Sequence, residues 1–334
     1  MTIKDLAAQT GYSVGTISRV LNNQPNVSEK AREIILQAAH ESGFQLNANA
    51  KQLKQQHGTS ILVVVKGISN ELFSRLVEAI QARVAQTDQP LVVDYIDEND
   101  NEVRRAVQLC REKKPIGILF LGGERENFLT DFHPITVPCV LVTSDASGLP
   151  FENLSSVTSD DALAGRMAID HLVSLGHRKF AVIGGDRDVS NISRLRYQGC
   201  LDAFREHDIP FDGELDYETI RFSYADGYTA VQNLLSRCRE FTALFAMSDV
   251  MAIGAIRALR DMGKQVPQDV SVVGFDGLDV SEYMFPRLTS IRQAVDKLAD
   301  RSLHQLLSSI DNTTHACHET IPVTLLRKES ARQI

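Results

Sequence analysis

The sequence predicts an α/β protein with doubly wound parallel sheets, preceded by a small all-α unit. Between residues 61 and 276, seven continuous apolar runs of strand length alternate with helical segments. Strands that are apolar throughout are typical of parallel sheets covered by helices on both faces, and seven of them are enough for two such sheets. Residues 1–45 instead show three short helical patterns separated by turn residues. This change of pattern predicts two structural units of different class.

The composition is that of an ordinary globular protein. Of the 334 residues, 43% are hydrophobic and 23% are charged, which excludes a disordered chain or a fibrous repeat. No apolar run approaches the roughly 20 residues that span a membrane, and the N-terminal segment MTIKDLAAQT lacks the features of a signal peptide. The five cysteines are an odd number without a C-x-x-C pair, as expected of reduced thiols. We therefore expect a cytoplasmic protein with no membrane partner.

The first unit has the pattern of a helix-turn-helix. Its first predicted helix covers residues 3–10, and the second covers 14–21 after Ser13, a good N-cap. A turn cluster follows, and Ser28 starts a third helix that ends near Gly43. Three short helices with a tight turn between the first two form a helix-turn-helix unit. The expected apolar face of the third helix consists of Ala31, Ile34, Ile35, Ala38 and Ala39.

Charge is distributed unevenly between the units. The whole chain carries a formal charge of −8, but residues 1–57 hold six Lys or Arg against four acids. The rest of the chain holds 29 basic residues against 39 acidic ones. A weakly basic first unit joined to an acidic body can meet phosphates while the body does not.

The body follows a polar linker, residues 47–59, which has no core-forming period. Its predicted strands cover residues 61–65, 90–96, 117–121, 138–142, 179–185, 243–247 and 271–276. Its predicted helices cover residues 71–86, 102–112, 160–175, 194–207, 226–237 and 249–262.

The patterns that suggest catalysis or cofactor binding lack the required context. The segment GYSVG, residues 11–15, matches a nucleophile elbow, but helices flank it where a strand should precede it. The glycine pairs at 122–123 and 184–185 follow strands without a nucleotide-binding motif, so we interpret them as turn glycines. Two histidines and a cysteine at 315–318 are too close in sequence to bind one metal ion without a distant ligand, which favours a surface loop. We expect no enzyme activity, no cofactor and no metal site.

The second helix of the first unit has an outer face suited to reading DNA. Ala7 and Gly11 permit a close approach and a tight turn of the first two helices, and Ile17 closes the small core. The side chains left outside can reach base edges and phosphates, although an ordinary helical hairpin is the alternative. They are Val14, Gly15, Thr16, Ser18 and Arg19.

Specific motifs run along the whole chain. Residues 2–22 are TIKDLAAQTGYSVGTISRVLN, and Val27-Ser28 and GFQLNANA at 43–50 follow. Further motifs in the body are ISNELF, HLVSLGHRKFAVI, RLRYQG, SDVMAIG, PQDVSVVGFD and PRLTSI. In these motifs the chain closely resembles the LacI/GalR family of bacterial transcription regulators. One departure is Tyr12, where the family usually has Val.

The resemblance implies a two-lobed body similar to periplasmic sugar-binding proteins, behind an all-α helix-turn-helix domain. The expected boundaries are 1–46 for the DNA-binding domain, 47–58 for a hinge helix or linker, and 59–334 for the effector-binding and dimerisation domain. Lobe 1 is expected at about 59–158 and 291–320, and lobe 2 at about 159–290 and 321–330.

The resemblance also implies a homodimer that binds a roughly palindromic operator. Val14 and Gly15 occupy recognition-helix positions that vary between members and read bases. Because Gly15 has no side chain, readout would rely on Val14, which can contact a thymine methyl group, on Arg19 and on the linker. Leu53 falls where the family inserts a leucine into the minor groove. The expected DNA contacts are Thr2, Ser13, Val14, Gly15, Thr16, Ser18, Arg19, Asn22, Asn47, Ala50, Leu53 and Lys54.

For the effector, the resemblance implies a pocket between the lobes, at the C-terminal ends of the strands. Arg196 and Asp276 would supply a charged donor and a charged acceptor to a hydroxylated ligand, and Phe222 a face for stacking. Thr143 stands where some sugar-binding members have Asp, so their hydroxyl-binding pattern is incomplete here. The expected effector contacts are Asn70, Phe73, Thr143, Arg196, Phe222, Ser248, Asp249 and Asp276.

We therefore predict a ligand-responsive, DNA-binding transcriptional regulator in the cytoplasm, associated with the nucleoid. It would repress carbohydrate-utilisation genes and take a sugar as its effector. The C-terminal sequence LLRKESARQI is no leucine-heptad extension, which favours a dimer over a tetramer. Alternatives within the family are control by a phosphorylated protein co-effector or by a purine-type ligand. A solute-binding protein and an enzyme on the same scaffold are alternatives from other classes.

Overall fold

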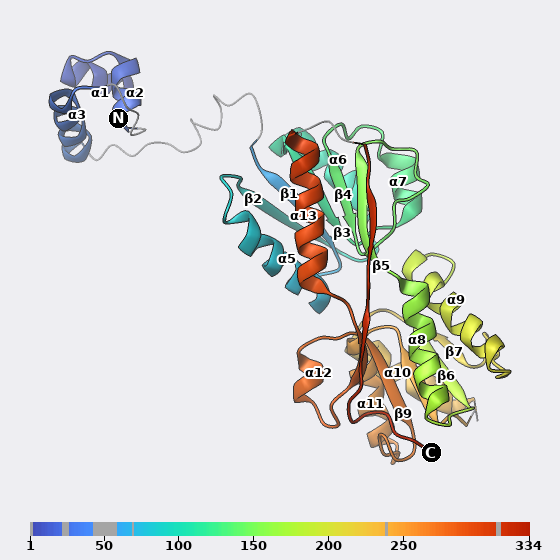
Figure 1. Cartoon of the computed structure of the whole chain (residues 1–334). Coiled ribbons are helices and arrows are strands. Elements are labelled where there is room, and N and C mark those ends of the chain that lie inside the picture. Colours follow the sequence, from blue (N-terminus) through green and yellow to red (C-terminus); the bar gives the residue numbers. More distant parts are fainter. Residues whose placement is uncertain (1–2, 22–26, 43–58, 69, 238–239, 312–314) are drawn as a thin grey trace. The chain divides into compact units, whose positions relative to one another are not determined.

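The chain forms two compact units, Met1–Gly58 and Thr59–Ile334 (Figure 1). The computed structural model describes residues 3–21, 27–42, 59–68, 70–237, 240–311 and 315–334. The expected hinge helix at 47–58 lies outside the described residues, and so do six of the expected DNA contacts. These six are Thr2, Asn22, Asn47, Ala50, Leu53 and Lys54.

The described part of the first unit contains α1 (Ile3–Thr10), α2 (Val14–Leu21) and α3 (Glu29–Glu41). Gly11 joins the first two helices with φ +73°, a left-handed conformation that glycine adopts without strain. Ser28 caps α3, because its Oγ accepts a hydrogen bond from the Ala31 N–H over 3.4 Å. The three predicted helices are therefore present, within two residues of the expected bounds.

A small apolar core holds these three helices together. Ile34, which we expected in the apolar face of α3, is instead 40% exposed. It lies about 100° around the helix from Ile35, whose side chain is fully buried, so it sits at the edge of the face. The buried core residues are Leu6, Ile17, Val20, Ile35, Ala38 and Ala39.

The body contains two six-stranded sheets, each of which forms one lobe (Figure 1). The first sheet is entirely parallel, in the order β11-β5-β4-β3-β1-β2. Its strands are β1 (Ile61–Lys66), β2 (Leu91–Ile96), β3 (Gly117–Leu121), β4 (Cys139–Val142), β5 (Leu154–Ser159) and β11 (His318–Ile321). The helices of this lobe are α5 (Glu71–Val84), α6 (Glu102–Lys113), α7 (Arg125–Asp131) and α13 (Val295–Asp311).

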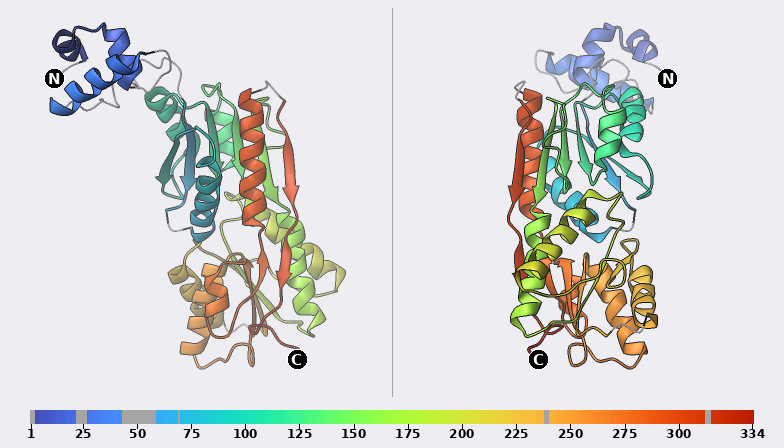
Figure 2. Two further views of the ribbon diagram at one scale, coloured as in Figure 1. Left: turned by 60° about the vertical axis from the view of Figure 1, so that its left-hand side comes forward. Right: turned by 90° about the vertical axis from the view of Figure 1, so that its right-hand side faces the viewer.

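Helices cover both faces of the first sheet, as a doubly wound sheet requires. One face packs against α5 and α13, which contact each other, and the other against α6 and α7. Figure 2 shows α13 running alongside the sheet, although its sequence follows five of the six strands of the second lobe. Successive side chains of β1 point to opposite faces of the sheet and therefore pack into two different apolar clusters.

The second sheet has the order β12-β10-β9-β8-β6-β7, in which only β12 is antiparallel to its neighbour. Its strands are β6 (Phe180–Gly184), β7 (Tyr217–Thr219), β8 (Ala243–Ala246), β9 (Ser271–Asp276), β10 (Thr289–Arg292) and β12 (Thr324–Leu326). The helices of this lobe are α8 (Asp161–Ser174), α9 (Asn191–Glu206), α10 (Tyr224–Ser236), α11 (Asp249–Asp261) and α12 (Val280–Tyr283).

Glycines allow two pairs of helices in the second lobe to pack backbone against backbone. A Cβ atom at Gly199 of α9 would lie 1.9 Å from the Ala162 carbonyl oxygen of α8. In the other pair, a Cβ atom at Gly254 of α11 would lie 2.0 Å from the Tyr224 carbonyl oxygen of α10. Any side chain at these positions would force the helices apart.

The chain passes between the lobes three times: from β5 to α8, from β10 to α13, and from β11 to β12. The expected lobe boundaries fall close to these crossings. Ile291 and Arg292 belong to β10 of the second sheet, whereas we expected lobe 1 to resume at 291. Ser159 and Ile321 still pair within the first sheet, each one residue beyond its expected boundary.

All seven predicted strands and all six predicted body helices are present, but several further elements were not predicted. The missed elements are β5, β7, β10, β11, β12, α7, α12 and α13. They are short, polar, or lie after residue 276, where we assigned no elements. Our prediction of a surface loop at 315–318 is wrong at its last residue, because His318 begins β11.

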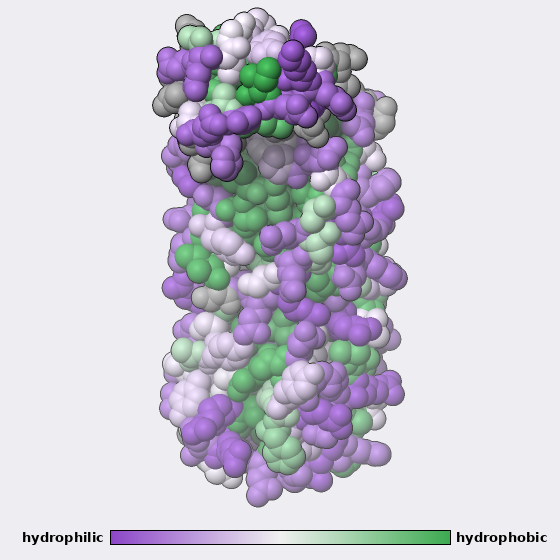
Figure 3. All heavy atoms as spheres, turned by 90° about the vertical axis from the view of Figure 1, so that its left-hand side faces the viewer, coloured by the Kyte–Doolittle hydropathy of each residue, from purple (hydrophilic) through white to green (hydrophobic). Residues whose placement is uncertain are grey.

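On the face shown in Figure 3, hydrophilic residues cover most of the surface and apolar residues gather in separate patches. Such a mixture is usual for a folded protein. None of the helices in the described part of the chain is both long and apolar enough to cross a membrane.

Candidate ligand pocket and DNA-binding helix

The second helix of the first unit has one buried and one exposed side. Ile17 and Val20 are buried in the small core, whereas Val14 is 40% exposed. Gly15 and Arg19 are exposed, and Thr16 is half-buried. This face carries the apolar, hydroxyl and guanidinium groups that contact bases and phosphates.

The start of α2 is fixed by a serine. The Ser13 Oγ accepts a hydrogen bond from the Thr16 N–H over 3.1 Å and also lies 2.9 Å from the Thr16 hydroxyl. Both hydroxyls are thus held at the N-terminus of the helix, where N–H groups favour an anion such as phosphate. The side chain of Ser18 lies outside what the structure describes.

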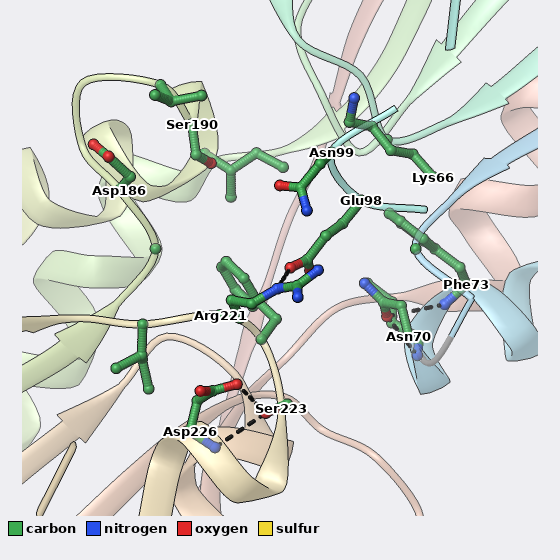
Figure 4. A pocket seen from close by; sticks show the side chains of 18 of the residues that line it. Lys66, Asn70, Phe73, Glu98, Asn99, Asp186, Ser190, Arg221, Ser223 and Asp226 are labelled. Atoms are coloured by element: carbon green, nitrogen blue, oxygen red, sulfur yellow. Dashed lines mark hydrogen bonds and ion pairs between the residues drawn. The ribbon is translucent and has the colours of Figure 1, made fainter. Parts of the chain in front are cut away.

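The body contains a pocket of about 910 Å³ that is lined by residues of both lobes (Figure 4). Its wall is formed by segments at the C-terminal ends of β1, β2, β3, β6, β7 and β9. Ligands of open α/β sheets bind at this edge. Six of the eight expected effector contacts line the pocket: Asn70, Phe73, Thr143, Arg196, Phe222 and Asp276.

Ser248 and Asp249 are not among the described residues that line the pocket. The Ser248 Oγ caps α11 by accepting from the Met251 N–H over 3.3 Å. The fully buried Asp249 carboxyl accepts from the Leu278 N–H over 2.7 Å and from the Ser290 hydroxyl over 2.6 Å. Burial raises the pKa of Asp249 to about 8. Ser248 thus fixes the start of α11 and Asp249 supports the loop that follows β9, and a direct contact of either with an effector stays a prediction.

Arg196 is held in the pocket wall by several groups. Its Nε donates to the Asp161 carboxylate over 2.8 Å, and another guanidinium nitrogen donates to the Met247 carbonyl oxygen over 2.6 Å. The guanidinium carbon lies 3.5 Å from the centre of the Phe275 ring. Burial raises the pKa of Asp161 even though Arg196 favours its ionised form. The donor fork is therefore pre-oriented, which reduces the entropy that binding would cost.

Asp276 has an unusual backbone conformation at the end of β9. Its φ is 110°, a strained value for a residue other than glycine, and such strain is concentrated at functional sites. Its Oδ1 accepts from the Gln293 amide over 2.9 Å, and the Gln293 Oε1 accepts from the Ser159 hydroxyl over 2.8 Å. Burial raises the pKa of Asp276 to about 7, against the effect of Arg196. This chain of bonds joins the pocket to two of the three crossings between the lobes.

On the side of the first lobe, Asn70 caps α5 by accepting from the N–H groups of Leu72 and Phe73 over 3.1 and 3.4 Å. The buried Thr143, with φ 72°, has a hydroxyl without a hydrogen-bond partner among the described residues. A buried unpaired hydroxyl is costly, and a ligand hydroxyl could satisfy it.

Several lining residues were not predicted as site residues. Gly122, Gly123 and Gly185, which we interpreted as turn glycines, form part of the pocket wall. At Gly185 a Cβ atom would lie 2.6 Å from the Ser193 Oγ and 2.9 Å from the Phe222 ring, so a side chain there would displace Phe222. Their position could have indicated this role, because all three glycines directly follow predicted strands.

Charged residues from the loops also line the pocket without having been predicted. They include Lys66, Asp97, Glu98, Glu124, Asp186 and Arg221. Figure 4 shows the Arg221 and Glu98 side chains meeting between Asn70 and Phe73 on one side and Asp186 and Ser190 on the other. The two residues are hydrogen-bonded across the lobes.

Comparison with known proteins agrees with this architecture. Residues 2–47 match the sequence model of bacterial regulatory proteins of the lacI family, and residues 169–331 match a periplasmic binding protein-like domain. The chain is 34% identical to the HTH-type transcriptional regulator MalR of Clostridium butyricum over the full length of both proteins. It belongs to the lacI family of bacterial transcriptional regulators.

Other relatives also cover most of the chain. The HTH-type transcriptional regulator GalR of Escherichia coli (strain K12) is 32% identical, over 93% of this chain and 90% of that protein. Among solved structures, a Lac repressor dimer bound to operator and the anti-inducer ONPF has a TM-score of 0.84 at 26% identity, with 99% of both chains covered. A complex of the transcriptional regulator CelR with cellobiose has a TM-score of 0.73 at 27% identity, also covering 99% of both chains.

The chain is thus an HTH-type transcriptional regulator whose first unit binds DNA and whose body has the two-lobed fold of periplasmic binding proteins. Among the described residues, no group of three or more His, Cys, Asp and Glu side chains is arranged to hold a metal ion.

Proposed function

We propose that this lacI-family protein is a homodimeric repressor of carbohydrate-utilisation genes whose effector is a sugar bound between the lobes. The observation that carries the proposal is the pocket itself. It combines the buried charged groups of Arg196 and Asp276 with the unpaired hydroxyl of Thr143 and the half-buried ring of Phe222. Charged and hydroxyl groups bond sugar hydroxyls, and an aromatic face packs against a sugar ring. The names of relatives, among them GalR and a cellobiose complex of CelR, support this class of ligand.

The DNA side of the proposal rests on the exposed face of α2. We assign base contacts to Val14 and Arg19, and contacts to phosphates or helix-terminal positioning to Ser13, Thr16 and Ser18. Gly15 allows close approach of the helix backbone without reading a base. Leu53 is assigned to the minor groove, where an apolar wedge unstacks a base step and bends the operator.

The two sites would be coupled through movement of the lobes. A ligand that touches both lobes favours one arrangement of the three crossings over another, because it binds the two arrangements with different affinity. Operator affinity then changes by the coupling free energy, typically about 1–3 kcal/mol. In a dimer of this kind, the linkers of both protomers would respond together.

Two further expectations belong to this proposal. Since DNA is the partner, we place the protein in the cytoplasm, at the nucleoid. We also expect no catalytic activity of its own, because the relatives are transcriptional regulators and the pocket acids serve to position groups. A purine-type ligand or a phosphorylated protein co-effector is the alternative source of the signal.

The test measures thermal unfolding of the full chain with mono- and disaccharides, sugar phosphates, nucleosides and purines. A ligand at about 100 times its Kd adds roughly 2.7 kcal/mol of stability, a clear shift in Tm. Any hit is then titrated against operator binding by fluorescence anisotropy. We expect a sugar to raise Tm and to change operator affinity, and Phe222→Ala to weaken both effects. Tyr283→Ala is the matched control, because Tyr283 is 89% exposed and outside the pocket. Stabilisation by purines alone would contradict the sugar assignment.

A further inference from the structure

The cationic groups of the pocket are already engaged by acids of the protein. Among the described residues, three cationic side chains line the pocket: Lys66, Arg196 and Arg221. The Lys66 Nζ lies 2.6 Å from the Glu102 carboxylate, and both side chains are buried. Arg196 is paired with Asp161, also buried, at 2.8 Å. Separating either pair would leave an uncompensated buried charge, so neither cation can leave its partner to pair with an anionic ligand.

Arg221 is the one of these three that a ligand can reach, because its side chain is 57% exposed. It follows β7 in the second lobe, and it is hydrogen-bonded to Glu98, which follows β2 in the first lobe. Its guanidinium also lies 3.6 Å from the Asp97 carboxylate. Figure 4 shows this pair among the other lining side chains, with its bond drawn between the two lobes.

Acids outnumber cations around the cavity. Of the residues that the structure describes, seven with carboxylic side chains line the pocket, against the three cationic ones. Burial raises the pKa of Asp276 to about 7, so this acid carries less negative charge at neutral pH than an exposed acid would; burial also raises the pKa of Glu124. Five other acids line the pocket, among them Asp97 and Asp186. The field at this site therefore repels anions, while carboxylates accept hydrogen bonds from neutral hydroxyl groups.

We propose that Glu98, by pairing with Arg221, makes the pocket select uncharged saccharides and reject sugars that carry a phosphate or a carboxylate. This inference rests on the proposed function, since it assumes that the pocket binds a sugar. Without Glu98, the Arg221 guanidinium would face the cavity with Asp97 and Asp226 as its nearby acids, and a sugar phosphate or uronate could bind it in a bidentate manner. Glu98 is thus a specificity-determining residue.

The experiment is isothermal titration of the full chain with matched ligands. The neutral set is glucose, galactose, maltose and cellobiose, and the anionic set is glucose 6-phosphate, galacturonate and maltose 6′-phosphate. Both sets are titrated into the wild type, Glu98→Gln, Glu98→Gln/Arg221→Gln and the control Glu126→Gln. Glu126 is an exposed acid outside the pocket lining, so its variant has the same charge change without touching the site. Thermal unfolding of each variant confirms that it is folded.

We expect the wild type and Glu126→Gln to bind a neutral saccharide more tightly than any anionic one. Glu98→Gln should bind an anionic counterpart at least roughly tenfold more tightly than the wild type does, and this gain should shrink as salt is raised to about 0.5 M. The double variant should lose the gain, because the cation is gone.

Each contrary result has a distinct meaning. Preferential binding of an anionic sugar by the wild type would overturn the inference and leave the sugar effector in place. An unchanged preference in Glu98→Gln would overturn the role of Glu98. Absence of binding for both ligand sets, in the wild type and in every variant, would overturn the proposed function and the inference with it.

Discussion

The Arg196 guanidinium donates to the Asp161 carboxylate over 2.8 Å, and each residue is only 4% exposed. This pair links α9 to the first turn of α8, two helices that pack closely through glycine. Arg196 also lines the pocket, so a group placed to meet a ligand is fixed by the scaffold of the second lobe. A ligand that bonds Arg196 would therefore act on a rigid part of the protein.

Removing Asp161 should be strongly destabilising. Asp161→Ala leaves the Arg196 charge buried without its partner, and breaking such a pair costs about 3–5 kcal/mol. Urea unfolding of the full chain, followed by circular dichroism, measures the change. Asp202→Ala removes the partner of Arg205 in a surface pair and should cost less than about 1 kcal/mol. Equal losses in the two variants would contradict the buried-pair argument.

The stability contributed by two buried acids should fall as pH rises. Burial raises the pKa of Asp276 to about 7 and that of Asp249 to about 8. An acid whose pKa is higher in the folded state binds more protons there than in the unfolded chain. Its stabilising contribution is complete below the unfolded pKa of about 3.9 and is lost as pH rises through the folded pKa. We expect the free energy of unfolding to decrease between pH 5.5 and about 8.5 for this reason.

The matched variant for this pH effect is Asp249→Asn. It keeps one oxygen to accept from the Leu278 N–H or the Ser290 hydroxyl, but it cannot ionise. Urea unfolding at three pH values should show a shallower decrease for Asp249→Asn than for the wild type. Identical slopes would mean that Asp249 does not titrate in this range.

The Thr143 hydroxyl should matter for binding and not for folding. Thr143→Val removes a buried hydroxyl that has no partner among the described residues and keeps the shape of the side chain. Stability without ligand should stay the same or increase slightly. Affinity for the sugar should fall by about 0.5–1.5 kcal/mol, the net value of one hydrogen bond. Titration calorimetry measures both the affinity and its enthalpy; an unchanged affinity would place the ligand away from Thr143.

Two glycine-to-alanine substitutions should have opposite effects. Gly199→Ala places a Cβ atom 1.9 Å from the Ala162 carbonyl oxygen and must separate α8 from α9, so we expect a loss above about 3 kcal/mol or no folded protein. Gly15→Ala meets only the Ser13 Oγ at 3.8 Å, so it should stabilise α2 by about 0.5–1 kcal/mol. Thermal unfolding of the two variants in parallel compares them. A destabilising Gly15→Ala would mean that this position needs the conformational freedom of glycine.

The sequence predicted the long helices and the buried strands because their periodicity is a local property. β5 was missed because LSSVTS is mostly polar, although all six of its residues are buried. Its hydroxyls find partners far along the chain: Ser155 accepts from the Cys317 N–H, and Ser159 donates to Gln293. The sequence of β5 alone does not indicate that such partners exist.

The candidate pocket was predicted in part for the same physical reason. Three of the lining residues lie at or after the ends of predicted strands: Asn70, Phe73 and Asp276. Position alone does not identify a ligand contact, and the resemblance to the LacI/GalR family supplied the further evidence. Glu98 and Arg221 lie 123 residues apart in unremarked loops, and only the tertiary fold brings their charges together. The expectation for Ser248 and Asp249 rests on their position after a strand, which does not distinguish a ligand contact from a group that supports the next loop.

The pairing of β5 with β11 has a consequence for how this chain must be made. Ser156 and His318 are neighbours in the sheet although 162 residues separate them, and α13, which covers the same sheet, also comes late in the chain. While the ribosome is still translating the second lobe, the first lobe has an open sheet edge and an uncovered apolar face. Neither lobe corresponds to one continuous stretch of the gene. A stop codon anywhere before residue 318 would therefore damage both lobes at once, and a domain library cut at a single point could recover neither.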